Sequence, residues 1–343
     1  MATSSTSTSA PKTGHALIWD ELEGGATAGT MTARRIHPES SRDLFLGFRR
    51  ADGKRAFLLQ VAKSALPSTS GLPQLRGIEV GQTDLPGDGT TRLTVGLFLK
   101  EERFFDVFSA LVADLAAHIA PSSSDVVAVH ALISRLTKWQ AFLENHAEGL
   151  KQEACRGLWG ELHFLREVAI PRLGAGAVKA WTGPRRVPQD FQFVDCAVEV
   201  KTSMTMRGQS LRIANERQLD NSHVAHLFLH HLSIEPLEGS GETLPAMVSS
   251  IRALCAGDPA SASRLEDRLI EVGFLDAHAT RYNSTGYSVR ETNFFRVTGG
   301  FPRLIESDLR AGVGAVSYSI TVDSCRPFEV PVVDVEAVLQ LPS

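Results

Sequence analysis

The sequence has little cysteine and no long hydrophobic run. Its four cysteines are spread over 343 residues and form no CxxC pair, so a zinc ribbon or a dithiol redox motif has no support. We expect four reduced thiols in a protein of the cytoplasm. No stretch of about 18 apolar residues occurs, which argues against a transmembrane helix and a membrane partner. No hydrophobic signal-peptide region follows the N-terminus.

The chain also lacks an excess of positive charge and a glycine-rich phosphate motif. Its formal net charge is -4 and its isoelectric point is about 6.3, which argues against a protein coated in positive charge. A local basic groove can still bind nucleic acid on such a protein. Neither GxGxxG nor a P-loop is present, so a role in an ATP-driven system would need another subunit as the motor.

Composition is that of an ordinary globular protein of two or three domains, with 43% hydrophobic and 22% charged residues. The N-terminus is rich in Ser and Thr, an Asp-Gly hairpin signal follows, and helical and strand-like patterns alternate further along. The predicted parts are a disordered tail (1–14), a β-rich N-terminal domain (15–120), a central core (125–236) and, after a linker, an α+β C-terminal region (243–343).

Two helices are expected early in this core. Apolar residues recur at three- and four-residue steps after Asp125, a plausible N-cap, and predict a helix to about Glu144. A second helix is predicted over 150–168, ending before Pro171. Glu161 sits on or beside its apolar stripe. A carboxylate there is costly unless something pairs with it, so the alternative to a catalytic role is a salt bridge to an arginine at the edge of the core.

Residues 187–203, VPQDFQFVDCAVEVKTS, combine a hairpin pattern with charged side chains. Alternation with a period of two places apolar side chains on one buried face: Phe191, Phe193, Val198 and Val200. The opposite face then carries the polar side chains Asp190, Gln192, Glu199 and Lys201. A turn around Asp195 and Cys196 would bring Asp190 near Glu199 and Lys201 at one end of a sheet.

This juxtaposition predicts metal chemistry. Two neighbouring carboxylates repel, and Mg²⁺ relieves the repulsion because it favours oxygen ligands and is usually held by one or two carboxylates plus substrate phosphate. A lysine can orient or deprotonate a metal-bound water and offset charge on the phosphate. We therefore expect phosphodiester hydrolysis at Asp190, Glu199 and Lys201. The alternative is that Asp190 caps a turn and the other two lie on a solvated strand face.

Downstream, SLRIANERQLDN predicts a short strand followed by a helix that starts near Asn215. Gln218 would lie in its first turn and face either solvent or the hairpin, where it could hold a water or a phosphate. Several cations around the hairpin predict a basic groove for a phosphate backbone, or else a scatter of solvated charges: Arg185, Arg186, Arg207, Arg212, Arg217 and Lys179.

Other conspicuous side chains are assigned to the core. On a strand, the four histidines of HVAHLFLHHL divide between two faces: His226 with His230, and His223 with His231. No Cys or acid joins them, so a metal role is not predicted. Trp139 and Trp159 lie in helical apolar patterns and are predicted to pack in the core rather than to stack on bases.

The order of these elements resembles the PD-(D/E)XK nuclease superfamily, whose core is shared by restriction endonucleases. More narrowly, several segments resemble one bacterial family assigned to that superfamily and often found in restriction or phage-defence gene clusters: KWQAFL, GLWGELHFL, QDFQF, AVEVKTS, RQLD, FFRVTGGFPRLIESDL and SYSITVDSCRPFEV. The resemblance covers most of the chain after the tail, whereas the active-site signature itself is short.

The resemblance implies an α/β fold with a restriction-endonuclease-like core, a mixed sheet flanked by helices. The first acid of the motif falls on Asp190, the second on Glu199, the lysine on Lys201 and the helix glutamate on Glu161, with Gln218 auxiliary. It implies a DNA endonuclease that uses Mg²⁺ or Mn²⁺, held by the three carboxylates, in bacterial defence against foreign DNA. Other subunits of a defence system are expected partners. A homodimer is also considered, because many nucleases on this fold pair to cut both strands.

The sequence departs from the superfamily pattern at one position. Gln189 stands between Pro188 and Asp190, where the superfamily often has Pro directly before the acid. That proline is frequently missing, and the groups that would bind the metal are all present. Two rival functions stay open on the sequence alone: a non-catalytic DNA-binding or scaffold subunit of a defence complex, and a nuclease acting on RNA or on damaged or branched DNA.

Overall fold

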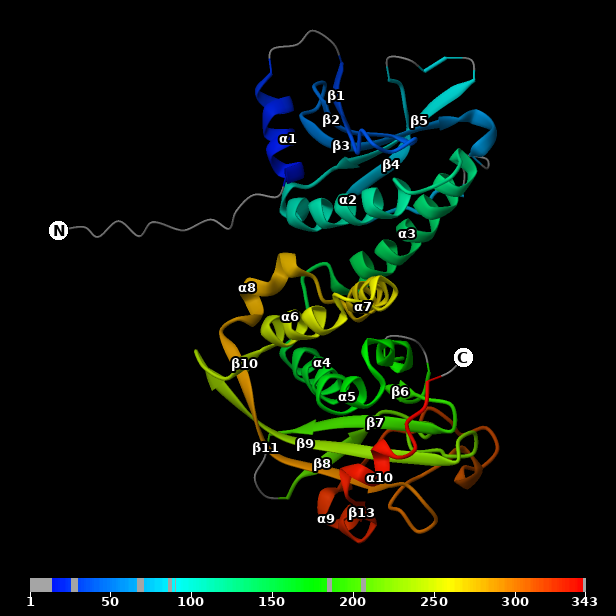
Figure 1. The fold of residues 1–343 in the computed structure, drawn as a ribbon, viewed down its shortest axis with the longest axis vertical. Coiled ribbons are helices and arrows are strands. Elements are labelled where there is room, and N and C mark those ends of the chain that lie inside the picture. The colour runs from blue at the N-terminus through cyan, green and yellow to red at the C-terminus, as the bar shows by residue number, and fades with distance from the viewer. Residues whose placement is uncertain are drawn as a thin grey trace, which may run out of the picture. The chain divides into compact units, whose positions relative to one another are not determined.

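The computed structural model divides the chain into two compact units, Met1–Ala147 and Glu148–Ser343. It describes residues 14–25, 30–66, 71–85, 88–89, 91–183, 187–204 and 208–341. Both units combine helices with a β-sheet (Figure 1), so the α/β class predicted from the sequence is confirmed. No helix among the described residues is long and apolar enough to cross a membrane.

The first unit is built on a five-stranded antiparallel sheet with strand order β1-β2-β3-β5-β4. The strands are β1 (Met31–Ile36), β2 (Asp43–Arg49), β3 (Lys54–Ala62), β4 (Ile78–Thr83) and β5 (Arg92–Leu99). Gly53, in the turn between β2 and β3, has a φ of 66°, a left-handed conformation that glycine adopts without strain. The Asp-Gly signal therefore predicts this hairpin correctly.

Three helices complete this unit: α1 (Gly14–Gly24), α2 (Phe105–Ile119) and α3 (Asp125–His146). The sequence pattern does not predict α1, because it indicates strands from residue 15 onward. The helix is held by tertiary contacts: Trp19 is fully buried, packs against Phe108 and donates from Nε1 to the carbonyl oxygen of Ala56 at 3.0 Å. Helix propensity does not include such long-range contacts, so the local sequence does not predict this helix.

The expected boundary at 121–124 lies inside the first unit. Ser124 caps α3 by accepting the N–H of Val127, so this polar stretch is a connection between α2 and α3, which pack together. Asp125, the predicted cap, instead accepts the backbone N–H of Ala62 at 2.8 Å. The structure therefore assigns α3 to the N-terminal unit and not to the core predicted over 125–236.

The second unit is built on a mixed sheet with order β10-β11-β9-β7-β6, in which β7 and β9 are parallel and the other neighbours are antiparallel. Its strands are β6 (Phe191–Gln192), β7 (Cys196–Ser203), β9 (His226–Glu238), β10 (Glu242–Thr243) and β11 (Thr285–Arg296), with β13 (Glu329–Val330) paired to β11. A separate two-stranded sheet pairs β8 (Ser210–Ile213) with β12 (Tyr318–Thr321).

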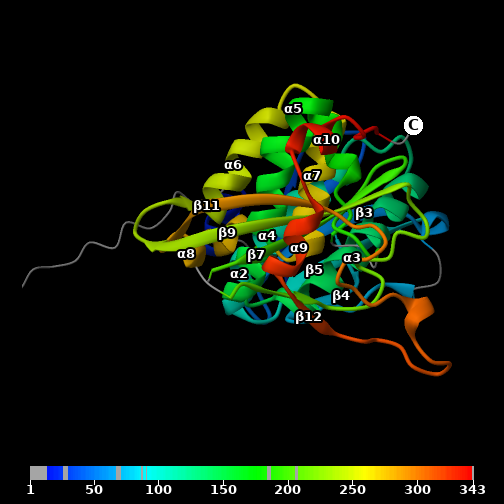
Figure 2. The ribbon, with the colours of Figure 1, turned by 90° about the horizontal axis from the view of Figure 1, so that it is seen from below.

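Helices cover one face of the mixed sheet, and the β8–β12 pair covers part of the other (Figures 1 and 2). Successive residues of β7 therefore enter two different cores: Val198 and Val200 pack with the helices, and Ala197 packs with β8. The helices of this unit are α4 (Gln152–Phe164), α5 (Ile170–Leu173), α6 (Leu244–Cys255), α7 (Pro259–Val272), α8 (Ala279–Tyr282), α9 (Val322–Cys325) and α10 (Val332–Glu336).

The second predicted helix continues further than expected. After α4 the chain makes a π-helical turn over Leu165–Ala169 and enters α5. Pro171 lies just after this π-helical turn, at the start of α5. Close packing of α4 on the sheet depends on Gly160, because a Cβ there would lie 2.4 Å from Cγ2 of Thr202 on β7.

The helix predicted from Asn215 does not form. The Asn215 side chain accepts the N–H of Arg217 at 3.0 Å and closes a turn within residues 215–219. The predicted linker over 236–242 is also absent, because β9 runs to Glu238 and pairs with β11. The C-terminal region is therefore part of the same sheet and core as the hairpin.

Most of the side chains assigned to the core from the sequence are found there, but His223 lies in a turn before β9 and is exposed, and His226 is only partly buried. Trp139 and Trp159 are 1% and 2% exposed. His230 is buried and stacks on Phe294 at 4.2 Å between ring centroids, and burial lowers its pKa to about 3. All four cysteines are buried and none forms a disulfide.

Candidate active site

A pocket of about 320 Å³ lies beside the hairpin formed by β6 and β7. It brings together the five residues that the sequence singles out for chemistry: Glu161, Asp190, Glu199, Lys201 and Gln218. They come from α4, from the residue before β6, from β7 and from the turn over residues 215–219. Segments separated by up to 57 positions in the sequence thus share one cavity, as the hairpin interpretation predicts.

The hairpin itself fixes Asp190. Phe191 pairs with Val198 across the two strands, and one step further the Asp190 carboxylate accepts the backbone N–H of Val200 at 2.8 Å. The Asp190 carbonyl oxygen accepts the N–H groups of Thr182 and Gly183 at 2.8 and 3.1 Å. Both the backbone and the side chain of Asp190 are therefore held, with one carboxylate oxygen used by β7.

Glu199 and Lys201 lie on the same face of β7. Nζ of Lys201 donates to Oε1 of Glu199 at 2.5 Å and to Oε1 of Gln218 at 3.3 Å. Gln218 Oε1 also accepts the N–H of Ala214 at 2.7 Å, so its amide oxygen is turned toward the lysine. The alternative reading of Glu199 and Lys201 as solvated surface residues fails, because Glu199 is 0% exposed and the Lys201 side chain 18%.

The other carboxylate oxygen of Glu199, Oε2, is buried and has no hydrogen-bond partner among the described residues. A buried charged oxygen without a partner is costly, and the group responds by binding a proton or a cation. Burial, reinforced by the nearby charge of Asp190, raises the pKa of Glu199 to about 8. Glu199 is therefore distinguished among the acids that line the pocket by a buried oxygen that has no partner among the described residues.

The other two acids are perturbed in the same direction. Burial raises the pKa of Glu161 well above its ordinary value, and the charge of Asp190 adds to the effect. Burial also raises the pKa of Asp190, against the opposing influence of Lys201. Three carboxyl groups that all resist ionisation surround one ammonium group, so the pocket as a whole favours an additional positive charge.

Glu161 is paired with an indole and not with the arginine considered from the sequence. Nε1 of Trp181 donates to Oε2 of Glu161 at 2.7 Å. The backbone approaches from the same side at Gly183, where a Cβ would lie 2.5 Å from that oxygen. Trp181 is fully buried, so it packs in the core and also orients an acid of the pocket.

Lys201 is held as an ammonium ion. Burial disfavours its charged form, but the charges of Glu199 and Asp190 outweigh burial and raise its pKa. In this state Lys201 is a hydrogen-bond donor and a source of positive charge.

The donor set fits a hard divalent cation. Among the described residues, no group of three or more His, Cys, Asp or Glu side chains is arranged to hold a metal ion. Mg²⁺ does not require such a cage, because one or two carboxylates, water and substrate phosphate are its usual ligands. Carboxylate oxygens line the pocket, and the partnerless Oε2 of Glu199 is the kind of atom that such a cation would satisfy.

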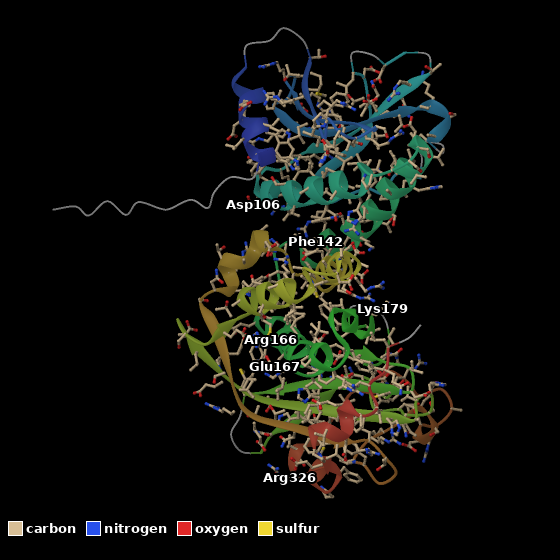
Figure 3. The ribbon with its side chains drawn as sticks, in the orientation of Figure 1. Asp106, Phe142, Arg166, Glu167, Lys179 and Arg326 are labelled. Carbon is tan, nitrogen blue, oxygen red and sulfur yellow. The ribbon has the colours of Figure 1, made fainter. Side chains whose placement is uncertain are left out.

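The predicted basic residues are not all found at the pocket. Arg212, on β8, lines it and is exposed. Arg185, Arg186 and Arg207 lie outside the described residues. Lys179 is on the 3₁₀ turn Ala175–Ala180, which packs against α7, and it does not line the pocket (Figure 3).

Arg156 is a pocket residue that the sequence argument misses. It lies on α4, lines the pocket, and donates from Nη1 to the sulfur of Met204 at 3.3 Å. Helical spacing carries the signal that could have found this wall: Gly157 and Glu153 precede Glu161 by four and eight residues and line the pocket with it.

The sequence also does not predict a structural role for Gln189, the residue that separates Pro188 from Asp190. It is 5% exposed, and its Nε2 donates to the carbonyl oxygens of Arg217 and Gln218 at 2.9 and 3.3 Å. Gln189 therefore ties the hairpin to the turn that carries Gln218. The departure from the superfamily pattern adds a contact that positions a pocket residue.

Comparisons with known proteins bear on this geometry. No curated protein and no solved structure shows significant similarity to the chain. The family model described as "Putative PD-(D/E)XK family member (DUF4420)" matches residues 15–323, which is most of the chain. The family identification made from the sequence motifs is confirmed. This chain belongs to that PD-(D/E)XK family.

Proposed function

We propose that this chain is a metal-dependent endonuclease that hydrolyses phosphodiester bonds of DNA in the pocket of Glu199 and Lys201. The observation that carries the proposal is the buried, partnerless oxygen of Glu199 beside Asp190 and an ammonium group. Membership of a PD-(D/E)XK family supports a nuclease-like activity. A role in bacterial restriction or phage defence is part of the proposal and rests on family resemblance alone.

Asp190 and Glu199 would hold Mg²⁺ or Mn²⁺, and Glu161 would bind the metal or orient its water shell. The cation supplies Lewis-acid polarisation of the scissile phosphate and an acidified water. Trp181 keeps Glu161 in place through its indole N–H. These residues are held before substrate arrives, so little reorganisation is needed at the moment of reaction.

Lys201 would stabilise charge on the phosphate and donate a hydrogen bond to the attacking water. Its pKa is raised only because the charges of Glu199 and Asp190 outweigh burial. Once a bound cation compensates those charges, burial favours the neutral amine, which could then accept a proton. Gln218 keeps Nζ pointed into the pocket in either state.

Arg156 and Arg212 would contact the phosphates that flank the scissile bond. They line the pocket from α4 and from β8. Contacts of this kind strengthen binding without selecting a sequence, and they make affinity fall with salt. Replacing either arginine by alanine should weaken DNA binding and flatten its dependence on salt.

The test is cleavage of plasmid, linear and single-stranded DNA and of RNA, with Mg²⁺ or Mn²⁺. Wild type is compared with Lys201→Met, which keeps much of the side-chain volume, and with Lys179→Ala, a control at an exposed lysine outside the pocket. We expect cleavage by wild type and the control, and a loss of at least about 10²–10³-fold in Lys201→Met. Circular dichroism checks that each variant is folded.

Equal cleavage by wild type and Lys201→Met would refute the site. Cleavage of RNA or branched DNA alone would keep the site and change the substrate. Metal binding without cleavage of any substrate would favour the scaffold function, in which the chain binds DNA within a larger complex.

A further inference from the structure

We propose that a second pocket beside the candidate active site binds an unstacked guanine base. Its volume is about 380 Å³, within the range of about 300–1,000 Å³ that is typical of small-molecule sites. The inference deepens the proposed nuclease function and rests on it for its setting in a polynucleotide. The binding chemistry itself can be tested without cleavage.

Two segments form the walls of this base pocket. Residues 188–192, entering the hairpin, form one wall, and residues 217–224, after the turn, form the other. Gln189 joins the walls at their base, because its Nε2 donates to the carbonyl oxygens of Arg217 and Gln218. The cavity is therefore built by the same hydrogen bonds that position Gln218.

Consecutive residues line the two pockets. Gln189 lines the base pocket and Asp190 the catalytic one, and in the same way Arg217 lines the base pocket and Gln218 the catalytic one. In a polynucleotide a single sugar separates a base from its phosphate. A nucleotide whose phosphate enters the catalytic pocket can thus place its own or a neighbouring base in this cavity.

The base pocket offers hydrogen-bonding groups that nothing in the described chain uses. Gln192 donates from Nε2 to Oε1 of Gln189 at 3.2 Å, and its own Oε1 accepts no hydrogen bond from the described residues. Oδ1 of Asp220 accepts the N–H of Ser222 at 2.9 Å, whereas Oδ2 has no such partner. The His223 ring is exposed at the pocket and makes no hydrogen bond within the described part of the chain.

The charges disfavour an anionic ligand. Arg217 faces two acids that line the same pocket, Asp220 and Glu306. The pair of Arg217 with Glu306 is long, at 3.5 Å, and both side chains are about 60% exposed, so a ligand can replace it at little cost. One guanidinium against two carboxylates repels a phosphate and suits a neutral ligand that has both donors and acceptors.

Guanine matches this set of groups. A guanidinium donates to its O6 and N7, which is the commonest specific contact with that base, and a carboxylate can accept from its N1–H and 2-amino group. Pro188 and Val224 supply apolar contacts for the faces of the ring. The N1–H and 2-amino edge is engaged in pairing within a duplex, so this arrangement requires a single-stranded or flipped-out base.

The experiment measures binding in EDTA, where a metal-dependent nuclease cannot cut. Fluorescence anisotropy compares a labelled oligothymidine with the same strand carrying one central guanine, inosine or 7-deazaguanine. Binding of guanosine and adenosine monophosphates is followed by NMR. The proteins are wild type, Asp220→Ala, Arg217→Ala, Lys201→Met and the control Asp195→Ala, an exposed acid on the same hairpin that lines neither pocket.

We expect the guanine strand to bind about tenfold more tightly than oligothymidine, the size of one good base contact. Inosine, which lacks the 2-amino group, should lose some of the preference that depends on Asp220, and 7-deazaguanine, which lacks N7, some of the preference that depends on Arg217. Both alanine variants should bind the guanine strand no better than oligothymidine, while Lys201→Met and Asp195→Ala keep the preference.

The outcomes separate this proposal from the nuclease function. Guanine-selective binding without any cleavage would support the base pocket and remove the proposed activity. Cleavage with no preference for guanine in strands or in free nucleotides would overturn the base pocket and leave the nuclease intact. Preference for free guanosine monophosphate alone would assign the pocket to a nucleotide ligand and overturn its role in reading a strand.

Discussion

Asp114 in the N-terminal unit and Glu199 in the C-terminal unit are both largely shielded from solvent, with side chains 13% and 0% exposed, but their carboxylates are satisfied in opposite ways. In the N-terminal unit, Asp114 accepts from Nε of Arg135 and from Nε1 of Trp139, both at 2.8 Å, and its other oxygen accepts from Nη2 of Arg135. In the C-terminal unit, Oε1 of Glu199 accepts a hydrogen bond from Lys201, and the second oxygen, Oε2, has no hydrogen-bond partner among the described residues.

The difference distinguishes an acid that supports the fold from one that is available for chemistry. Asp114 has donors on both oxygens, so its hydrogen-bonding capacity is met within the fold. Glu199 is left with an oxygen that nothing in the described fold satisfies and that a bound cation or a proton would satisfy, and its pKa is raised by burial. Unmet hydrogen-bonding capacity in a pocket is therefore a better guide to function than burial of charge alone.

The largest effect is expected at Glu199, where the question is whether the carboxylate is needed for activity or only for folding. Glu199→Gln keeps an acceptor for Lys201 and removes the charge. We expect DNA cleavage to fall by about 10³-fold or more, since several kcal/mol of metal-derived stabilisation would be lost, while the free energy of unfolding stays equal or rises. Cleavage rates and urea denaturation measure the two effects. A large loss of stability with cleavage retained would reverse the assignment.

The next largest effect should come from Asp114→Ala. The change breaks a buried ion pair, because the Arg135 side chain is 5% exposed, and should lower the free energy of unfolding by about 3–5 kcal/mol. Activity per folded molecule should be unchanged at low temperature. Asp195→Ala, at an exposed acid, is the matched control. If Asp114→Ala were as stable as that control, the contrast between the two acids would disappear.

The pH dependence of the free energy of unfolding tests the unusual state of Glu199. The pKa of Glu199 rises on folding from its ordinary value of 4.5 to about 8, so between these values the folded state holds a proton that the unfolded state has lost. This contribution is fully present at low pH, and stability should fall as pH rises through that window. Denaturation series in EDTA should show the fall in wild type and less of it in Glu199→Gln. Parallel pH profiles would contradict the prediction.

Trp181→Phe should have the smallest of these effects. Phenylalanine keeps most of the packing but cannot donate to Glu161, so the carboxylate loses its orientation. Loss of such a supporting hydrogen bond typically costs about 10–100-fold in metal affinity or activity. Metal titration and cleavage rates measure the effect. Trp159→Phe is the control, since Trp159 is equally buried and lines neither pocket.

The sequence predicts the hairpin well because the relevant signals are local. Alternation with a period of two places Val198 and Val200 on one face of β7 and Glu199 and Lys201 on the other. The short turn then brings the Asp190 carboxylate within reach of the N–H of Val200. The pattern also predicts that Glu161 needs a partner. It does not identify Trp181, which lies 20 residues away and meets Glu161 only when α4 packs on the sheet.

Other features depend on packing that no short window of sequence contains. The polar stretch before α3 resembles a domain boundary, although α3 packs on α2 within the first unit. Asn215 resembles a helix cap, but its side chain closes a turn that Gln189 then holds against the hairpin. Residues of that turn form one wall of the base pocket, so a prediction that places a helix there does not reveal the pocket.

The most direct test of this account is Mn²⁺ binding, followed by the electron paramagnetic resonance of the free ion, in wild type, Glu199→Gln and Asp114→Asn. We expect wild type and Asp114→Asn to bind Mn²⁺ with release of protons, and Glu199→Gln to bind Mn²⁺ far more weakly. Equal binding by wild type and Glu199→Gln would show that the partnerless oxygen is not the place where the metal is held.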